Sequence, residues 1–502
     1  MSEAVSAEAS QLLSGRLLAR NSIWNLLGLG LPLGVAVAVI PALVGVLGTE
    51  RFGLLTLGWA LVGYFSLFDL GLGRALTKLV AERIAKGEVT DLPVLIGTGL
   101  VLLTGLGLVA CLALLAAVPI LVESVLAVPP ALRGEASTSF SVLALGLPVV
   151  ILSSALIGIL EAQQRFRSIN LVRIPAGVLT YVGPLLATLV APNLVAATLA
   201  LVLVRVASTA LYLWSCRSAL PRGRAVFRRG HVRPLVAFGA WVTVSNIIGP
   251  LMVYFDRFVV GAMVSLAAVA YYATPYEVVT RSWVLPTAVS AVLFPALTMA
   301  VTTDHRRLER LFGAAIDVIV LTMAIPLALV VLFAPEGLHA WLGAGWAEQS
   351  APVLRWLSLG VFINSVARVP SALIQGVGRP DLTAKLHVLE LAPYGAALIL
   401  LLSTFGIAGA AAAWTMRIVV DTAALFWLAV WLAPALRGVA QSAVLKTVAA
   451  VIAMAAAAVP GDPWLKVGYV VLLGLIGGWL IWDARHRMTA SIPRAEWLRS
   501  DR

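Results

Sequence analysis

Long apolar runs separated by short polar segments extend along almost the whole sequence. A helix needs about 20 mostly apolar residues to cross the roughly 30 Å hydrocarbon core of a bilayer. The runs in this chain reach that length, and turn signals such as Pro129-Pro130 and Gly461-Asp462-Pro463 separate them. The pattern therefore predicts an all-α membrane protein that crosses the bilayer many times.

We expect about fourteen transmembrane helices. The first six cover about 21–47, 53–80, 92–121, 139–162, 171–190 and 194–216. The next six cover about 235–262, 267–298, 311–334, 351–376, 384–404 and 406–433. The last two cover about 442–459 and 464–482.

The first twelve spans repeat one six-helix plan. Residues in the first half recur in the second at offsets of 207 to 218 positions, as in Trp24 and Trp241, Pro32 and Pro250, Gly146 and Gly360, Pro175 and Pro393, Arg74 and Arg281, and Arg205 and Arg417. Paired repeats in membranes place the substrate site at their interface and let one half rock against the other. The repeat predicts a transporter of two pseudo-symmetric six-helix lobes plus two C-terminal helices.

Basic residues define the expected topology and domains. Lys and Arg concentrate on alternate connections, and the positive-inside rule then places both termini in the cytoplasm. We expect a cytoplasmic tail at 1–20, an N-lobe at 21–217, a basic cytoplasmic inter-lobe loop at 218–234, a C-lobe at 235–433, helices thirteen and fourteen at 434–482, and a basic cytoplasmic tail at 483–502. The net charge of +12 follows these inner loops, so anionic membrane lipids are the expected partners and nucleic acid is not.

The sequence contains no recognisable catalytic arrangement. The five histidines lie in or beside loops without ligand spacing, and Cys111 and Cys216 lie on different apolar runs. There is no phosphate-binding loop for a nucleotide. We therefore expect no enzymatic activity, no cofactor and no metal site.

Charged residues inside the spans are the candidate site, because such residues are costly in lipid and normally face protein or a cavity. In the first half Arg74, Lys78 and Arg205 outnumber the single acid Asp69. An unpaired cationic cluster of this kind suits a pyrophosphate, for which Arg offers two parallel hydrogen bonds. We expect Arg74 and Arg205 to face one central cavity, with Lys78 lower on its wall or extended to the membrane surface.

The second half adds Arg281, Arg368 and Arg417 to the expected pyrophosphate-binding set. Glu277–Arg281 and Arg417–Asp421 have i,i+4 spacing, so each pair is explained equally well by mutual neutralisation on one helix face or by a role in transport.

Carboxyl groups and polar aromatic residues complete the candidate set. Asp69, Glu277 and Asp421 are candidates for proton or sodium coupling, with static packing or neutralisation as the alternative explanation. Trp59, Tyr64, Asn246 and Tyr254 are candidate sugar contacts.

Three motifs in order resemble a known family. They are Glu50-Arg51-Phe52-Gly53 with the run from Phe65 to Arg74, the run from Gly378 to His387, and the run from Gly406 to Arg417. Together they resemble the bacterial oligosaccharide flippases of the multidrug/oligosaccharidyl-lipid/polysaccharide exporter superfamily. The resemblance implies alternating-access transfer of a polyprenyl-pyrophosphate-linked oligosaccharide to the outer leaflet of the bacterial inner membrane, without ATP, for surface polysaccharide biosynthesis.

Relatives within that superfamily are the alternatives. A cation-coupled multidrug or metabolite exporter is less favoured because the predicted first span, 21–47, contains neither Asp nor Glu. A lipid II flippase is less favoured because no arginine lies between Arg20 and Arg51. A non-transporting scaffold of a polysaccharide assembly complex is also less favoured, because that role does not explain the charged residues inside the spans. The resemblance also implies polysaccharide polymerase or export machinery as partners, and we expect the chain to function as a monomer.

Overall fold

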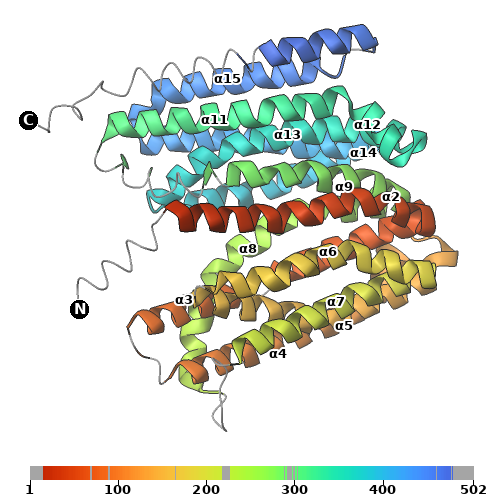
Figure 1. Ribbon diagram of the computed structural model, residues 1–502, viewed down its shortest axis with the longest axis vertical. Helices are drawn as coiled ribbons and strands as arrows, with labels where there is room; N and C mark the ends of the chain where they lie inside the picture. The colour runs from red at the N-terminus through yellow and green to blue at the C-terminus, as the bar shows by residue number, and fades with distance from the viewer. Residues whose placement is uncertain are drawn as a thin grey trace, which may run out of the picture. The chain divides into compact units, whose positions relative to one another are not determined.

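The computed structural model describes residues 15–67, 71–86, 88, 91–163, 165–217, 227–287, 289–290, 297, 300–301, 304–459, 461–475 and 478. Every regular element within these ranges is helical (Figure 1). Nine helices in this part are long and apolar enough to cross a membrane. The predicted all-α membrane fold is therefore confirmed, and these helices are consistent with the predicted number of fourteen spans.

The chain divides by its internal contacts into two compact units. Unit 1 comprises residues 1–278 and 387–410, and unit 2 comprises residues 279–386 and 411–502. The lobe boundaries expected from the sequence repeat stay a prediction.

Unit 1 is built around one central helix. Its helices are α2 (Gly15–Leu67), α3 (Leu72–Ala85), α4 (Leu92–Ile120), α5 (Arg133–Ala162), α6 (Phe166–Val190), α7 (Leu194–Cys216), α8 (Arg229–Met263) and α9 (Leu266–Thr280, which ends just past the unit). Helix α5 packs against α4, α7, α3 and α2, while α6 lies against α7 and α2. The side chain of Asn193 caps the start of α7 by accepting a hydrogen bond from the Ala196 N–H at 2.8 Å, as its type favours.

Unit 2 contains the helices of the second part of the chain. They are α11 (His305–Leu332), α12 (Ala334–Leu342), α13 (Ala344–Gly376), α15 (Arg437–Ala456), a short apolar helix at Pro463–Leu475, and the two ends of α14 (Pro380–Leu432). Helix α13 packs against α11 and α12, and α15 lies along α11. The sequence predicts only a connection between the spans at 311–334 and 351–376, but α12 begins there, because the proline at 335 fits the first turn of a helix.

Two long helices each contain one break. Helices α2 and α14 both extend over 53 residues, and each is interrupted by a glycine with positive φ, 76° at Gly48 and 60° at Gly406. Such φ values cannot belong to a right-handed helix, and glycine adopts them without steric cost. The predicted boundaries near residues 48 and 405 are therefore confirmed.

The predicted single span at 53–80 is wrong at Gly71. Helix α2 ends at Leu67, and α3 begins at Leu72 after Gly71, whose φ of 67° is left-handed. This left-handed conformation interrupts the helix, so Arg74 stands in the first turn of a separate helix.

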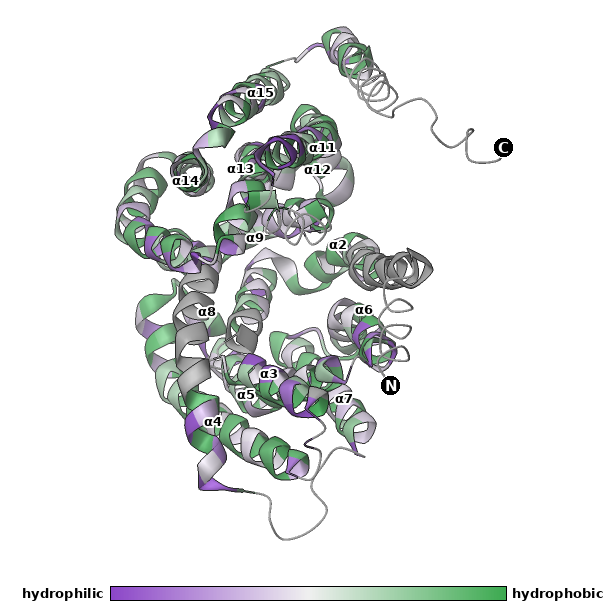
Figure 2. Ribbon diagram, turned by 90° about the vertical axis from the view of Figure 1, so that its left-hand side faces the viewer, coloured by the Kyte–Doolittle hydropathy of each residue, from purple (hydrophilic) through white to green (hydrophobic). Residues whose placement is uncertain are grey.

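Hydrophobic residues recur along most of the helices (Figure 2). Leu112 on α4 and Val190 on α6 in unit 1, and Leu445 on α15 in unit 2, are large and exposed. Large exposed apolar side chains on such helices are suited to lipid rather than to water.

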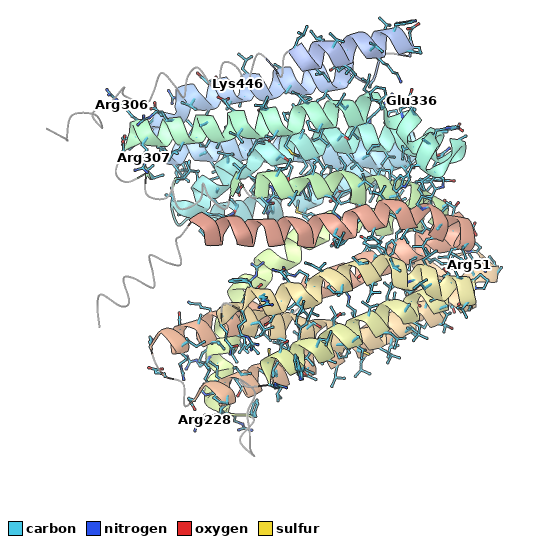
Figure 3. The ribbon with its side chains drawn as sticks, in the orientation of Figure 1. Arg51, Arg228, Arg306, Arg307, Glu336 and Lys446 are labelled. Carbon is cyan, nitrogen blue, oxygen red and sulfur yellow. The ribbon has the colours of Figure 1, made fainter. Side chains whose placement is uncertain are left out.

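Charged residues mark the two ends of each unit (Figure 3). In unit 1, Arg51 and Arg228 lie at opposite ends, and in unit 2 Arg306 and Arg307 lie at the end opposite Glu336. These placements agree with the alternation of inner and outer connections that the basic residues predict. The orientation in the membrane stays a prediction.

Candidate functional site

A buried group of charges and aromatic rings joins α8 to α9 in unit 1. We call it the Arg257 cluster, and it consists of Tyr254, Asp256, Arg257, Tyr272, Tyr276 and Glu277. The Arg257 guanidinium is 1% exposed and donates a hydrogen bond from Nη2 to Glu277 Oε1 at 2.8 Å. It also lies 4.9 Å from the ring centroid of Tyr276 and 5.3 Å from that of Tyr254. Aromatic faces and a carboxylate together offset the cost of burying this cation.

Two hydrogen bonds fix the other carboxylate of this cluster. The Tyr272 hydroxyl donates to Asp256 Oδ2 at 2.5 Å, and the backbone N–H of Arg257 donates to Asp256 Oδ1 at 2.8 Å. Asp256 is fully buried, whereas the Glu277 side chain is 33% exposed. Glu277 is therefore the more accessible carboxylate of the Arg257 cluster.

Glu277 has a partner that the sequence did not predict. Its i,i+4 neighbour Arg281 opens a 3-10 turn directly after α9 ends at Thr280, and the pairing of these two residues stays a prediction. An ion pair to Arg257 crosses between two helices, over a separation of 20 residues. Glu277 therefore helps to hold α9 against α8.

Arg205 lies on α7 beside aromatic residues of neighbouring helices. It is half-buried and makes no ion pair with any residue that the structure describes. Tyr181 on α6 and Tyr212 on α7 lie within electrostatic range of its charge. Trp59 on α2 packs edge-on against Tyr181 at 5.3 Å, and its buried indole N–H has no hydrogen-bond partner within the described ranges. Trp59 thus borders Tyr181, which lies within electrostatic range of Arg205, and neither the Trp59 indole N–H nor the Arg205 guanidinium has a hydrogen-bond partner among the described residues.

Arg74 and Lys78 lie one turn apart on α3, in different surroundings. Arg74 is exposed and forms no ion pair in the described part of the chain. Lys78 pairs with Glu82 on its own helix at 3.6 Å. Glu82 lies just beyond the predicted span at 53–80, so the predicted cationic cluster did not include this pair.

A close helix contact positions Arg74. Gly158 on α5 faces α3, where an added Cβ would lie 2.3 Å from the hydroxyl oxygen of Thr77. The absence of a side chain at Gly158 lets the two helices approach closely. Helix α3 is thereby held against α5, with Arg74 on an exposed face.

Unit 2 holds a second group of a guanidinium and indole rings, which we call the Trp283 group (Trp283, Arg368 and Trp414). The Arg368 guanidinium lies 5.6 Å from the ring centroid of Trp283, and the Trp283 and Trp414 rings are 6.5 Å apart. Arg368 is half-buried and has no ion pair among the residues with described positions. In this group Trp283 lies on the 3-10 turn, Arg368 on α13 and Trp414 on α14.

The remaining candidates of the second half lie in unit 2. Arg417 and Asp421 are one turn apart on α14, as expected, with Arg417 half-buried and Asp421 buried. Arg281 is half-buried. Their assignment to substrate or ion binding stays a prediction.

Three candidates fall outside the described residues. Asp69 lies in an undescribed segment, and the side chains of Tyr64 and Asn246 are likewise not described. Tyr254 is half-buried within the Arg257 cluster. Across the described ranges, no group of three or more His, Cys, Asp or Glu side chains is arranged to hold a metal ion.

Sequence reasoning missed several residues that the structure brings together. Arg257, Tyr272 and Tyr276 were not assigned to the site, nor were Tyr181 and Trp283. The signal for the first three was present, because Asp256-Arg257 interrupts an apolar run and the two tyrosines have i,i+4 spacing. No sequence signal pairs Trp283 with Arg368, which lies on another helix.

Known proteins match both the sequence and the fold. Residues 18–301 match the model of the family described as polysaccharide biosynthesis protein. The chain is 30% identical over 410 residues to a Shigella flexneri protein named "Putative O-antigen transporter", which covers 82% of this chain and 97% of that one. Helices, in-span charges and both matches define a polytopic membrane protein of the transporter type. The chain belongs to the polysaccharide biosynthesis protein family.

Solved structures share the fold at low sequence identity. One is an inward-facing multidrug resistance MATE family transporter of the MOP superfamily, with a TM-score of 0.70, 18% identity, and coverage of 81% of this chain and 95% of that one. Another is the lipid II flippase MurJ in an inward closed conformation, with a TM-score of 0.69, 11% identity, and coverage of 93% and 99%. These likenesses establish the fold alone.

Proposed function

We propose that this chain is a flippase for a polyprenyl-pyrophosphate-linked oligosaccharide. It moves the lipid-linked repeat unit from the inner to the outer leaflet of the bacterial cytoplasmic membrane, and so serves surface polysaccharide biosynthesis. The observation that carries the proposal is the 30% identity to a protein named as an O-antigen transporter, over nearly the whole of that protein. The family match supports the same substrate class.

Three arginines supply the chemistry that such a substrate requires. Arg74, Arg205 and Arg368 make no ion pair with any described residue. A cation inside a membrane protein is costly unless an anion or water compensates it. The pyrophosphate of the substrate would provide that compensation, with Arg281, Arg417 and Lys78 as further members of the set. Arg74 and Arg205 would face one central cavity, and transport would proceed by alternating access.

The sugar portion requires hydrogen-bond donors and ring faces. Trp59 offers both, because its indole N–H is unsatisfied within the described ranges and its ring borders Tyr181. Tyr254, Tyr64 and Asn246 complete the proposed sugar contacts.

Glu277 is the leading candidate for coupling to a proton or sodium gradient. Its side chain is partly exposed although it pairs with a fully buried arginine, so the carboxyl can exchange a cation from outside the cluster. Asp69 and Asp421 are the other candidates. The static alternative is that Glu277 only neutralises Arg281, as the i,i+4 spacing predicts, together with Arg257.

Partners and orientation complete the proposal. Both termini would lie in the cytoplasm, and the basic loops at 218–234 and 483–502 would contact anionic lipids. Polysaccharide polymerase or export machinery would receive the product on the outer side. The chain would act as a monomer, without catalytic activity of its own.

The test is a leaflet assay in cells depleted of this chain. Labelled lipid-linked repeat units should accumulate on the cytoplasmic side, and wild-type protein should restore their appearance outside. Arg205→Gln should fail to restore it at normal protein level, whereas the matched control Arg306→Ala, exposed at one end of α11, should restore it fully. Unchanged outer-leaflet repeat units after depletion, with lipid II or drug export impaired instead, would favour the alternative transporters. Normal transport of the repeat units, of lipid II and of drugs after depletion would favour the non-transporting scaffold.

A further inference from the structure

Arginines without acidic neighbours gather where α6 begins and α7 ends. They are Arg165, Arg167, Arg173 and Arg217. The sequence contains no Asp or Glu between Glu161 and Asp256, and none of the four arginines forms an ion pair with a residue that the structure describes. Membrane topology accounts for the arginines but not for the lack of acids, because Asp and Glu contribute little to orientation. The uncompensated charge therefore points to an anionic partner.

Three of these arginines come together from the two helices. Arg165 Nη1 donates a hydrogen bond to the backbone carbonyl oxygen of Ser215 at 2.7 Å, which joins the start of α6 to the end of α7. Arg173, about two turns further along α6, lies within electrostatic range of Tyr212 on α7. Arg217 follows α7 directly. The packing of α6 along α7 therefore places the three arginines at the same end of the helix pair.

Exposed aromatic rings lie beside these arginines. The Arg217 guanidinium lies 4.7 Å from the ring centroid of Trp214, a residue that is 63% exposed. Phe166, in the first turn of α6, is 45% exposed and shares a helix face with Arg173, seven residues later. Tryptophan is enriched at membrane–water interfaces, where its ring lies at the level of the lipid headgroups. The arginines therefore stand at the depth where headgroups and acyl chains meet.

This position selects the kind of anion. Exposed rings and apolar helix faces around the arginines are suited to hydrocarbon, so the anion must belong to a lipid. A guanidinium binds phosphate oxygens through two parallel hydrogen bonds. All three arginines lie within about two turns of a helix end, so a headgroup bound there stays at the membrane surface. A lipid that remains in its leaflet fits this position better than one that is carried across.

We propose that Arg165, Arg173 and Arg217 form a binding site for the phosphate headgroup of an anionic phospholipid, which we call the α6–α7 lipid site. The predicted topology assigns it to the inner leaflet. Arg173 and Arg217 contact the phosphate oxygens, Arg165 holds the two helix ends together, and Trp214 lies beside the headgroup. The site is separate from the basic loops at 218–234 and 483–502, and it does not depend on the proposed function.

Native mass spectrometry of the full-length protein in detergent tests the site. Phosphatidylglycerol should bind more tightly than phosphatidylcholine, because the choline ammonium offsets the phosphate charge. Arg173→Gln and Arg217→Gln should each raise the Kd for phosphatidylglycerol about threefold, and the double variant about tenfold, which corresponds to about 1.4 kcal/mol. Arg173→Lys should weaken binding less than Arg173→Gln, because the charge remains while the bidentate geometry is lost.

The matched control is Arg167→Gln. Arg167 is exposed at the same end of α6, but it lies about 120° around the helix from Arg173. This variant removes one charge from the same region and should bind phosphatidylglycerol like wild type. Because a ligand that binds only the folded state stabilises it, phosphatidylglycerol should also raise the unfolding midpoint of wild type and of Arg167→Gln more than that of the double variant.

The same measurements can overturn the site. Equal affinity of the wild type for phosphatidylglycerol and phosphatidylcholine would exclude recognition of the headgroup charge. Equal weakening by Arg167→Gln and Arg173→Gln would show attraction to diffuse surface charge instead of a site. If the double variant lost binding of farnesyl pyrophosphate but kept wild-type affinity for phosphatidylglycerol, these arginines would belong to a transported pyrophosphate lipid, and the assignment to a resident phospholipid would fail.

Discussion

The guanidinium of Arg257 donates a hydrogen bond to the carboxylate of Glu277 across 2.8 Å, and this ion pair joins α8 to α9. Its two members are unequally accessible, with side-chain exposures of 1% and 33%. The Arg257 guanidinium is therefore enclosed by protein, while the Glu277 carboxylate is partly exposed. This asymmetry allows stability and coupling to be tested at different residues.

Replacement of Arg257 by alanine should destabilise the protein. The change removes the cation that pairs with Glu277 and leaves a cavity beside the rings of Tyr254 and Tyr276. Breaking one side of a buried ion pair costs about 3–5 kcal/mol. Thermal unfolding in detergent should show a large drop in midpoint and a lower membrane protein level. Unchanged unfolding would contradict the structural role of the Arg257 cluster.

Replacement of Glu277 by glutamine should separate stability from coupling. The amide oxygen can still accept the hydrogen bond from Arg257, so folding should be nearly preserved. Export driven by an imposed proton or sodium gradient should be lost if Glu277 carries the coupling ion. The assay compares gradient-driven export by Glu277→Gln and wild type in inverted vesicles, with Arg306→Ala as a control. Gradient dependence identical to wild type would remove Glu277 from the coupling mechanism.

Replacement of Gly360 by alanine should disturb Trp414. The new methyl group would meet the indole ring at 2.4 Å in a fully packed region, so the ring must move. Overpacking of this kind typically costs about 1–3 kcal/mol. The expected result is a lower unfolding temperature together with altered near-ultraviolet circular dichroism. Gly337→Ala is the matched control because no atom lies within 4 Å of the added Cβ there.

The contact between Glu336 on α12 and Lys466 on the short helix at Pro463–Leu475 should depend on pH. The hydrogen bond from the Lys466 ammonium holds the pKa of Glu336 below its ordinary value of 4.5. A carboxyl group with a lowered folded-state pKa stabilises the fold above its ordinary pKa, and this contribution is lost as the pH falls through the folded-state value. The pair is partly exposed, so the coupling should be only about 0.5 kcal/mol at pH 7.

A double-mutant cycle with Glu336→Gln and Lys466→Met measures this coupling. Its value should be positive at pH 7 and smaller at pH 3, because the carboxyl group takes up protons as the pH falls below its ordinary pKa and through the lowered folded-state pKa. A coupling energy that is the same at both pH values would show that the carboxylate charge is not involved.

The sequence predicted the helices better than it predicted their contacts. Apolar runs of membrane-spanning length identify the spans, and glycine at 48 and 406 coincides with real breaks because φ there is positive. The partners of the charged residues were harder to infer. The i,i+4 rule searches only one helix, whereas Glu277 pairs with Arg257 on another helix, and Asp317 pairs with Lys446 at a separation of 129 residues. Pairings of this kind depend on helix packing, which local spacing does not encode.

The same limitation affected the candidate site. Arg205 was correctly seen to lack an acid on its own helix, but its aromatic neighbour Tyr181 comes from α6 and follows from the packing of α6 against α7. Trp283 was overlooked because a single tryptophan in an apolar run has no pattern that marks it. Its importance appears only with Arg368 beside it.

The most direct measurement is flipping of a fluorescent lipid-linked oligosaccharide in proteoliposomes that contain wild-type protein or Arg74→Ala. Arg74 is exposed and makes no ion pair with a described residue, so its removal should leave folding intact. A glycosidase added outside reports the substrate that reaches the outer leaflet. The proposed function predicts transfer by wild type and by Arg306→Ala. At equal reconstitution, Arg74→Ala should lose at least 90% of the transfer rate, which is about a tenfold decrease. The reason is that one phosphate-binding arginine contributes about 1.4 kcal/mol or more. Equal flipping by Arg74→Ala and wild type would contradict the assigned role of Arg74, and no flipping by wild type would contradict the proposed function itself.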